Sequence, residues 1–354
     1  MKKFISMLAI FLASSLIGMA DTLDEALSFY NKGDYYSAIK LVKPLAEQGN
    51  AEAQLLLGRC FVEKGDYGSG IKLLKPLAEQ GNTAAQFWLG RYFVAKDDLA
   101  SGIKWLKPLA EQGNSEAQLW LGVCFFGKGD YGSAIKLLKP LAEQGNTDAQ
   151  LVLGRCFVWK RDYTSAMKWL KPLSEQGNAD AQLWLGACFF GKRDYDSAIK
   201  WLKPLAEQGN VNAQIELGTC FAEKGDYDSA MKLIKPLAEQ GNTDAQLVLG
   251  RCFADKGDYD SAIKWLKPLA EQGNPEAQVW LGACFFGKRD FTSVIKLLRP
   301  LAAQGNTDAQ LLLGMCFFGE RDYDSGIKLL KPLAEQGNAT AQLFLKQCLF
   351  NSLL

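Results

Sequence analysis

The residues with the greatest capacity for chemistry in this sequence are nine cysteines, and their spacing is regular. They recur at intervals of 32 or 64 residues, as Cys60, Cys124, Cys156, Cys188, Cys220, Cys252, Cys284, Cys316 and Cys348. No zinc motif has this spacing. The chain has no histidine, which excludes Ser-His-Asp and Cys-His catalytic arrangements and most metal sites. We therefore expect no catalytic, cofactor or metal site, and we expect the cysteines to be small buried hydrophobic residues.

The cysteine interval belongs to a longer repeat. The octet Lys43-Pro44-Leu45-Ala46-Glu47-Gln48-Gly49-Asn50 or a near copy returns every 32 residues without insertion or deletion, with its proline at Pro76, Pro108, Pro140, Pro172, Pro204, Pro236, Pro268, Pro300 and Pro332. Ten copies at a constant period indicate a repeat solenoid. Counting from the residue after each junction asparagine makes Ala51 position 1 and Asn82 position 32, and every cysteine then occupies position 10.

Each repeat is expected to hold two helices. The first spans positions 1–14, as in Ala51 to Lys64, with Asn50 as its N-cap. Asp66 caps a second helix from Tyr67 to Gln80, which ends at a left-handed glycine, Gly81. The proline at position 26 is expected to kink or break the second helix, because it cannot donate a hydrogen bond and clashes with the carbonyl four residues earlier. Packed helices lie about 8–10 Å apart, whereas the Cα atoms of a disulfide lie within about 7 Å, so regular disulfides between repeats are not expected.

The two sides of the first helix differ in how much they vary. At about 100° per residue, positions 3, 4, 7, 8, 10 and 11 fall in one nearly constant sector, where neighbouring helices must meet. Positions 2, 6, 9 and 13 fall opposite and vary between copies, so we expect them to line a binding groove. The candidate groove residues are Arg59, Trp88, Arg91, Trp120, Arg155, Trp159, Trp184, Glu216, Arg251 and Trp280.

The tryptophans at position 6 are expected to be partly exposed. The same position accepts Glu216, which a fully buried site would tolerate poorly. The alternative is that these rings pack against neighbouring first helices. The arginines at position 9 favour a partner with acidic or carboxylate groups, and the alternative for them is ordinary solvated charge.

The repeat resembles a known family. Residues Gln48 to Gly58 read Gln-Gly-Asn-x-x-Ala-Gln-x-x-Leu-Gly, which is similar to the junction motif of Sel-1-like repeat proteins in the tetratricopeptide (TPR)-like superfamily. Gly65-Asp66-Tyr67 is closer to a tetratricopeptide turn. The resemblance covers Asp21 to the C-terminus. It implies an all-α fold, an α/α solenoid in which antiparallel helix pairs stack as a right-handed superhelix and first helices line a concave groove.

The start of the chain is typical of a secretory signal. A short basic start is followed by an apolar run from Phe4 to Ile17 and by the small residues Gly18 and Ala20. We expect residues 1–20 to be a signal peptide cleaved after Ala20, and residues 21–354 to be one solenoid of ten helix pairs with a C-terminal capping helix. The alternative is an uncleaved anchor, although the apolar run is shorter than the roughly 20 residues of a membrane span.

These features predict a non-catalytic scaffold, periplasmic or secreted, that binds a protein or extended peptide along its concave face. Removal of Lys2 and Lys3 with the signal leaves 38 basic and 39 acidic residues, which argues against nucleic acid or an anionic membrane surface as partner. Two alternatives remain. The first alternative is a penicillin-recognising hydrolase, because some secreted Sel-1-like proteins with paired cysteines in each repeat are associated with penicillin hydrolysis, although this chain has at most one cysteine per repeat. The second alternative is a secreted factor acting on host proteins.

Overall fold

The computed structural model describes the backbone of residues 19–352, and these residues form helices and short turns without a strand. Residues 19–31 are helical. The helices that follow are α2 (Tyr35–Glu47), α3 (Ala51–Glu63), α4 (Tyr67–Glu79), α5 (Thr83–Ala95), α6 (Leu99–Glu111), α7 (Ser115–Gly127), α8 (Tyr131–Glu143), α9 (Thr147–Trp159), α10 (Tyr163–Glu175), α11 (Ala179–Gly191), α12 (Tyr195–Glu207), α13 (Val211–Glu223), α14 (Tyr227–Glu239), α15 (Thr243–Asp255), α16 (Tyr259–Glu271), α17 (Pro275–Gly287), α18 (Phe291–Ala303), α19 (Thr307–Gly319), α20 (Tyr323–Glu335) and α21 (Ala339–Ser352). The predicted signal peptide lies outside the described residues except for positions 19 and 20.

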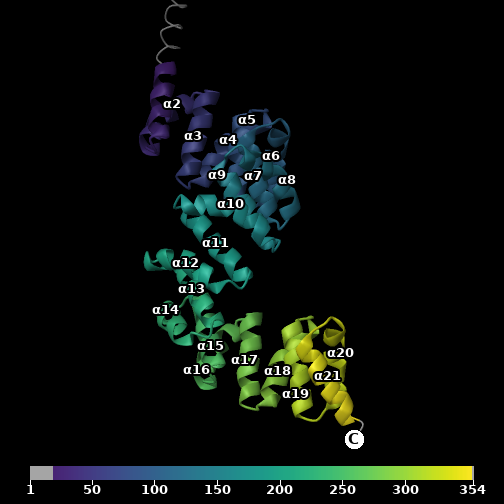
Figure 1. The fold of residues 1–354 in the computed structure, drawn as a ribbon. Helices are drawn as coiled ribbons and strands as arrows, with labels where there is room; N and C mark the ends of the chain where they lie inside the picture. Colours follow the sequence, from purple (N-terminus) through teal and green to yellow (C-terminus); the bar gives the residue numbers. More distant parts are fainter. Residues whose placement is uncertain (1–18, 353–354) are drawn as a thin grey trace, which may run out of the picture. The chain divides into compact units, whose positions relative to one another are not determined.

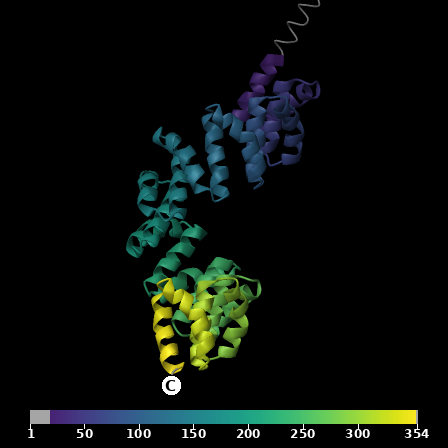
Figure 2. The same ribbon diagram turned by 90° about the vertical axis from the view of Figure 1, so that its right-hand side faces the viewer.

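The chain divides into two compact units, Met1–Glu175 and Gln176–Leu354. The described helices of the first unit run to α10, and the second unit holds α11 to α21 (Figure 1). Within each unit every helix packs against the next, and first helices of successive repeats also touch one another, as α7 touches α9 and α17 touches α19. Figure 2 shows these stacked pairs from the side. The predicted all-α solenoid of helix pairs is confirmed.

The predicted caps define the ends of the helices. The backbone amide of Ala53 donates to Oδ1 of Asn50 over 2.8 Å, and the amide of Ser69 donates to Oδ1 of Asp66 over 3.2 Å. Hydrogen bonds from the side chain and backbone of Ser69 lower the pKa of the Asp66 carboxyl. Gly81 has a φ of +90°, the left-handed conformation that ends a helix without the steric penalty of a Cβ atom. Both helices of this repeat end one residue before their predicted ends.

The proline at position 26 does not interrupt the second helix. Helix α4 runs from Tyr67 to Glu79 through Pro76, and the carbonyl of Pro76 still accepts the amide of Gln80 over 3.1 Å. The predicted break is therefore wrong. Lys72, whose carbonyl loses its usual partner, and Pro76 are both exposed, so this carbonyl lies on the solvent side of a helix that has only one more turn to complete.

The two helices of each repeat approach most closely at the glycine of position 8. A Cβ atom on Gly154 would lie 2.5 Å from Cγ of Leu170, at position 24, and on Gly58 it would lie 2.7 Å from Cγ of Leu74. These distances are far inside van der Waals contact, so only glycine leaves room for the leucine. The predicted close approach of the helices is confirmed.

In the first repeat, a different pair of residues forms the contact between positions 8 and 24. Ala26 replaces the glycine of position 8, and Val42 replaces the leucine of position 24. Both side chains are fully buried in one cluster with Ala53. The methyl group gained on the first helix is therefore matched by a smaller side chain on the second.

A glutamine ties each repeat to the preceding one. Nε2 of Gln54 donates to the carbonyl of Ala46 over 3.1 Å, and Nε2 of Gln150 donates to Ala142 over 2.9 Å. The accepting carbonyls lie in the last turn of the second helix, where backbone acceptors lack helical partners. The constant residue at position 4 thus has a structural role at the junction.

The last helix, α21, packs against α20 and α19 at the end of the second unit (Figure 2). Leu343 and Phe350 on this helix are exposed. None of the helices among residues 19–352 is both long and apolar enough to span a membrane.

The glycine–leucine contact gives a prediction about stability. Gly154→Ala should destabilise the protein by about 1–3 kcal/mol, because the added methyl overlaps Leu170. Leu170→Val in the same chain should recover part of this loss, since the first repeat pairs alanine with valine. Urea unfolding of the two single variants and the double variant measures the coupling energy; additive losses would contradict the proposed contact.

Candidate functional site

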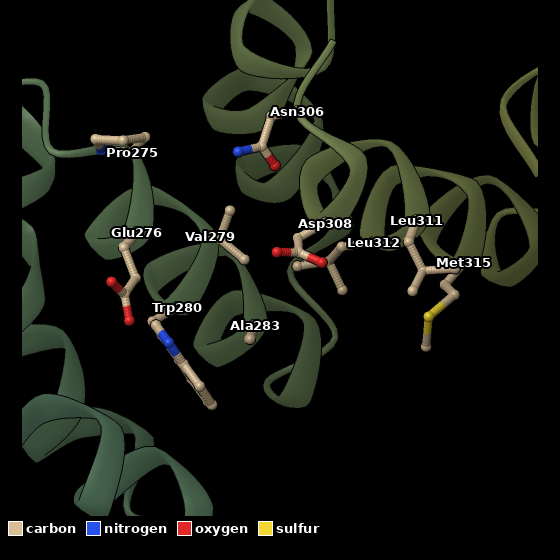
Figure 3. Close-up of a pocket in the computed structure, with 10 residues that line it drawn as sticks. All are labelled: Pro275, Glu276, Val279, Trp280, Ala283, Asn306, Asp308, Leu311, Leu312 and Met315. Carbon is tan, nitrogen blue, oxygen red and sulfur yellow. The ribbon is translucent and has the colours of Figure 1, made fainter. Parts of the chain in front are cut away.

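Three cavities open between the first helices of successive repeats. In the first unit, a cavity of about 590 Å³, here called the arginine hollow, lies over α3, α5, α7 and the start of α9; its lining includes Arg59, Phe87, Trp88, Arg91, Glu116, Leu119, Trp120 and Asp148. In the second unit, a cavity of about 300 Å³, the carboxylate hollow, is lined by Leu183, Trp184, Ala187, Asn212, Ile215, Glu216 and Asp244. A third cavity of about 610 Å³, the methionine hollow, lies between α17 and α19 (Figure 3).

The lining residues come from a small set of repeat positions. All three cavities use positions 2, 5, 6 and 9, and the first and third also use the start of a first helix or its cap. Position 5 was missed in the sequence, although at about 100° per residue it lies beside position 9 on the helix. Position 13 lines none of these cavities. We call positions 2, 5, 6, 9 and 13 of the first helices the first-helix face.

Aromatic rings and guanidinium groups alternate along the first-helix face of the first unit. Cζ of Arg59 lies 4.4 Å from the ring centroid of Tyr30 and 5.1 Å from that of Trp88. Cζ of Arg91 lies 4.5 Å from Trp88 and 4.8 Å from Trp120. Cation–π contacts of this kind are worth about 0.5–2 kcal/mol each. The alternation holds these side chains in a fixed order across four first helices, from residues 19–31 to α7.

Trp88 and Trp120 differ in how much surface they present. Trp88 is buried, at 8% exposure, between the two arginines, so the expected partial exposure does not hold for it. Trp120 is half-buried and lines the arginine hollow. Nη1 of Arg91 also lies 3.5 Å from Oε1 of Glu63. Arg91 is therefore largely engaged within the protein.

Arg155 and Trp159 lie on the same first helix, α9, but line none of the three cavities. Cζ of Arg155 lies 4.6 Å from the ring centroid of Phe126. Trp159 is 58% exposed and stacks on Tyr131 with ring centroids 6.2 Å apart and an interplanar angle of 11°. Trp159 is thus the most exposed of the predicted tryptophans, at the C-terminal end of its helix.

The carboxylate hollow brings two acidic side chains together beside an indole ring. Glu216 from α13 and Asp244 from α15 line it together with Trp184 from α11. Burial, and to a smaller extent the neighbouring Asp244, raises the pKa of the Glu216 carboxyl. Within the described part of the chain, Glu216 forms no ion pair, so the carboxylate has no counter-ion to offset its burial.

The methionine hollow has a mainly apolar lining that also includes two carboxylates. Figure 3 shows Val279 and Trp280 on α17, and Leu312 and Met315 on α19. Asp308 reaches into the gap toward Val279, and Glu276 lies beside Trp280 on the same helix. Trp280 is half-buried, so one part of its ring packs and another lines the cavity.

Arg251 packs against Trp280 and is neutralised within the protein. Its Cζ lies 5.0 Å from the Trp280 ring centroid. Nη2 of Arg251 donates to Oε1 of Glu223 over 2.7 Å, and Nη1 lies 4.0 Å from Oε1 of Glu276. The expectation of an acidic partner depended on free arginines at position 9, and the structure pairs both Arg91 and Arg251 with carboxylates.

The cysteines do not belong to these cavities. All nine are buried and unbonded, which confirms the expectation of small buried side chains. Burial raises the pKa of the Cys156 and Cys188 thiols to about 12. Among the described residues, no group of three or more Cys, Asp or Glu side chains is arranged to hold a metal ion.

The buried thiols predict a pH-dependent loss of stability. A thiol whose folded pKa is raised favours the fold fully below its unfolded pKa of about 9, and this contribution is lost as the pH rises further. Unfolding free energy should therefore fall above about pH 9, and less steeply in a Cys156→Ala, Cys188→Ala variant when compared at pH 8 and pH 10.5. Native thiols should react with a thiol reagent at pH 8 only on unfolding; rapid labelling of the folded protein would contradict the burial.

Comparison with known proteins finds repeat families over most of the chain. Two tetratricopeptide repeat models match residues 23–83 and 89–149, and residues 125–187 and 221–284. The Sel1 repeat model matches residues 179–210, and a model of anaphase-promoting complex, cyclosome, subunit 3, matches residues 255–332. No curated protein sequence matches the chain.

Comparison with solved structures finds the following two similar proteins. The first is c5321, a protective antigen of uropathogenic Escherichia coli strains with an SLR fold; it is 28% identical over 93% of this chain and 79% of its own, with a TM-score of 0.55. A tetratricopeptide repeat protein from Parabacteroides merdae is 14% identical over 75% of this chain and 98% of its own, with a TM-score of 0.49.

Proposed function

We propose, from the premise that this chain is a Sel1-like repeat protein of the tetratricopeptide-like class, that it is an exported, non-catalytic scaffold that binds an extended protein segment. Its repeat fold is typical of protein–protein interaction. The binding surface in this proposal is the first-helix face of each unit. The partner docks across a rigid row of side chains and fills the hollows between them.

The observation that carries this proposal is the placement of variable and constant residues. Constant positions lie at close helix contacts, as Gly58 does, or at junction hydrogen bonds, as Gln54 does. The variable positions 2, 6 and 9 line open cavities, together with position 5. Side chains that differ between copies can distinguish the parts of a ligand, whereas identical ones cannot. Half-buried tryptophans such as Trp120 and Trp280 are also the residue type enriched at interface hot spots.

A non-catalytic role agrees with the chemistry of the side chains. The chain has no histidine, and the thiols lie buried with raised pKa values, as at Cys156 and Cys188. Activated nucleophiles need a nearby base or a lowered pKa. The scaffold in this proposal therefore acts by holding a row of side chains in place for a partner to bind.

The export part of the proposal has its own test. It is supported by the basic and apolar start of residues 1–17 and by the small residues before Asp21, and the similar antigen c5321 agrees with it. Expression of the full chain in a Gram-negative host should yield a mature protein beginning at Asp21, outside the cytoplasm. N-terminal sequencing of fractionated protein measures this, and an intact Met1 in the cytoplasmic fraction would contradict it.

The binding part is tested by removing half-buried rings that line the hollows of the first-helix face. Trp120→Ala and Trp280→Ala should each weaken capture of the partner from periplasmic extract by roughly 30-fold, the size of a loss of about 2 kcal/mol at a hot spot. Bound proteins are quantified by mass spectrometry.

The matched control changes the opposite side of the repeats. Lys136 and Lys200 are exposed residues at position 22 of second helices, and their alanine variants should keep full binding. Circular dichroism must show the same helicity in all four variants. Equal capture by the tryptophan and lysine variants would contradict a role for the first-helix face.

A further inference from the structure

The methionine hollow has the shape and lining of a site for a bulky apolar side chain. Its volume of about 610 Å³ lies within the usual range for ligand pockets. Trp280, Leu312 and Met315 contribute apolar surface from two helices, and the flexible thioether of Met315 allows the lining to adapt to an occupant. Glu276 and Asp308 also line the hollow, and Asp308 reaches into the gap between the helices (Figure 3), so an occupant meets negative charge beside the apolar surface.

The whole first-helix face of the second unit is strongly acidic. It carries seven carboxylates and a single basic residue, Arg251; the carboxylates are Asp180, Glu216, Glu223, Asp244, Asp255, Glu276 and Asp308. Arg251 is already paired with Glu223 and Glu276. The corresponding face of the first unit offsets five carboxylates with three arginines. The two units therefore present different charge to a partner, and only the second has a large acidic excess.

In the carboxylate hollow, part of this charge has no counter-ion among the described residues. Acidic residues at position 2, such as Asp244, favour the positive end of their own helix dipole. Glu216 lies in the middle of its helix, is half-buried, and forms no ion pair among the described residues. Trp184 also lines this hollow, and the neighbouring carboxylates of Glu216 and Asp244 suit a lysine or arginine side chain through ionic contacts.

We propose that the first-helix face of the second unit binds a basic protein segment, with a bulky apolar side chain in the methionine hollow and a lysine or arginine in the carboxylate hollow. The inference rests on the proposed scaffold function and names the chemistry of its partner. The occupant supplies the counter-ion that Glu216 lacks in the free protein and covers the apolar wall around Trp280.

The spacing of the hollows sets the length of the segment. They lie two to three repeats apart, which at about 10 Å per packed helix is roughly 20–30 Å. An extended chain covers this in about six to nine residues at roughly 3.3 Å each. The anchor residue and the basic residue of a partner should therefore be separated by about this number of residues.

The experiment uses the mature full-length protein and three labelled peptides. Each has a Gly-Ser background and one phenylalanine, with lysine, glutamine or glutamate eight residues away, and each is made in both orders. Fluorescence polarisation should show the lysine peptide binding on the order of five- to tenfold more tightly than the glutamine peptide, and the glutamate peptide more weakly than both. Raising the salt concentration should reduce these differences.

Variants test whether residues of the second unit cause the preference for the lysine peptide. Glu216→Gln should abolish the advantage of lysine over glutamine, and Trp280→Ala should weaken all three peptides. Glu207→Gln makes the same change on an exposed part of α12, outside the first-helix face, and should keep the lysine preference.

Three results would overturn the inference. They are equal or tighter binding of the glutamate peptide, a lysine preference that survives Glu216→Gln, and no binding of any peptide. None of them removes the proposed function by itself, because partner capture and its loss in Trp120→Ala or Trp280→Ala are measured independently of these peptides.

Discussion

The contact between the glycine of position 8 and the leucine of position 24 is the constraint on which the rest of this structure depends. At Gly154 and Leu170 it brings the two helices of a repeat so close that a single methyl group has no room. The contact recurs from Gly58 to Gly314, with Ile234 in place of the leucine at Gly218, so the two helices of each of these repeats approach equally closely at this position. Within each unit, successive pairs then pack against one another, and an insertion inside a repeat would disturb this packing. In the first repeat both residues of the contact change together, since Ala26 replaces the glycine and the smaller Val42 replaces the leucine.

This constraint explains why most of the fold is readable from the sequence. The residues that repeat without change lie at close contacts between helices or form hydrogen bonds with backbone groups. Both roles depend on residues that are near in the sequence. Asn50 and Asp66 were identifiable as caps because their side chains accept amides three residues later. The predicted break at the proline was wrong for a physical reason, whereas the predicted kink stays a prediction. The cost of the proline depends on which side of the helix it occupies, and Pro76 lies on the exposed side near the end of α4.

The site was predictable only in part, because exposure depends on neighbours distant in sequence. Positions 2, 6 and 9 were found through their variation, whereas position 5 varies only among apolar residues and gave no such signal. Trp88 and Trp120 share position 6, yet only Trp88 lies between two arginines. Burial of that ring follows from Arg59 on the preceding first helix and Arg91 on its own. Neither the wheel position nor the residue type of Trp88 contains that information.

The arginines show most clearly how ion pairs within the protein change the surface charge that the composition predicts. Glu63 and Arg91 are 28 residues apart, as are Glu223 and Arg251, because position 13 of one first helix lies beside position 9 of the next. A row of arginines that favours an acidic partner in the sequence is therefore partly neutralised in the structure. The charge that remains for a binding partner comes from the carboxylates that form no such ion pair. These carboxylates are concentrated in the second unit around Glu216. Repeats that share one scaffold can thus differ in the charge they present, because only the positions outside the helix contacts are free to change.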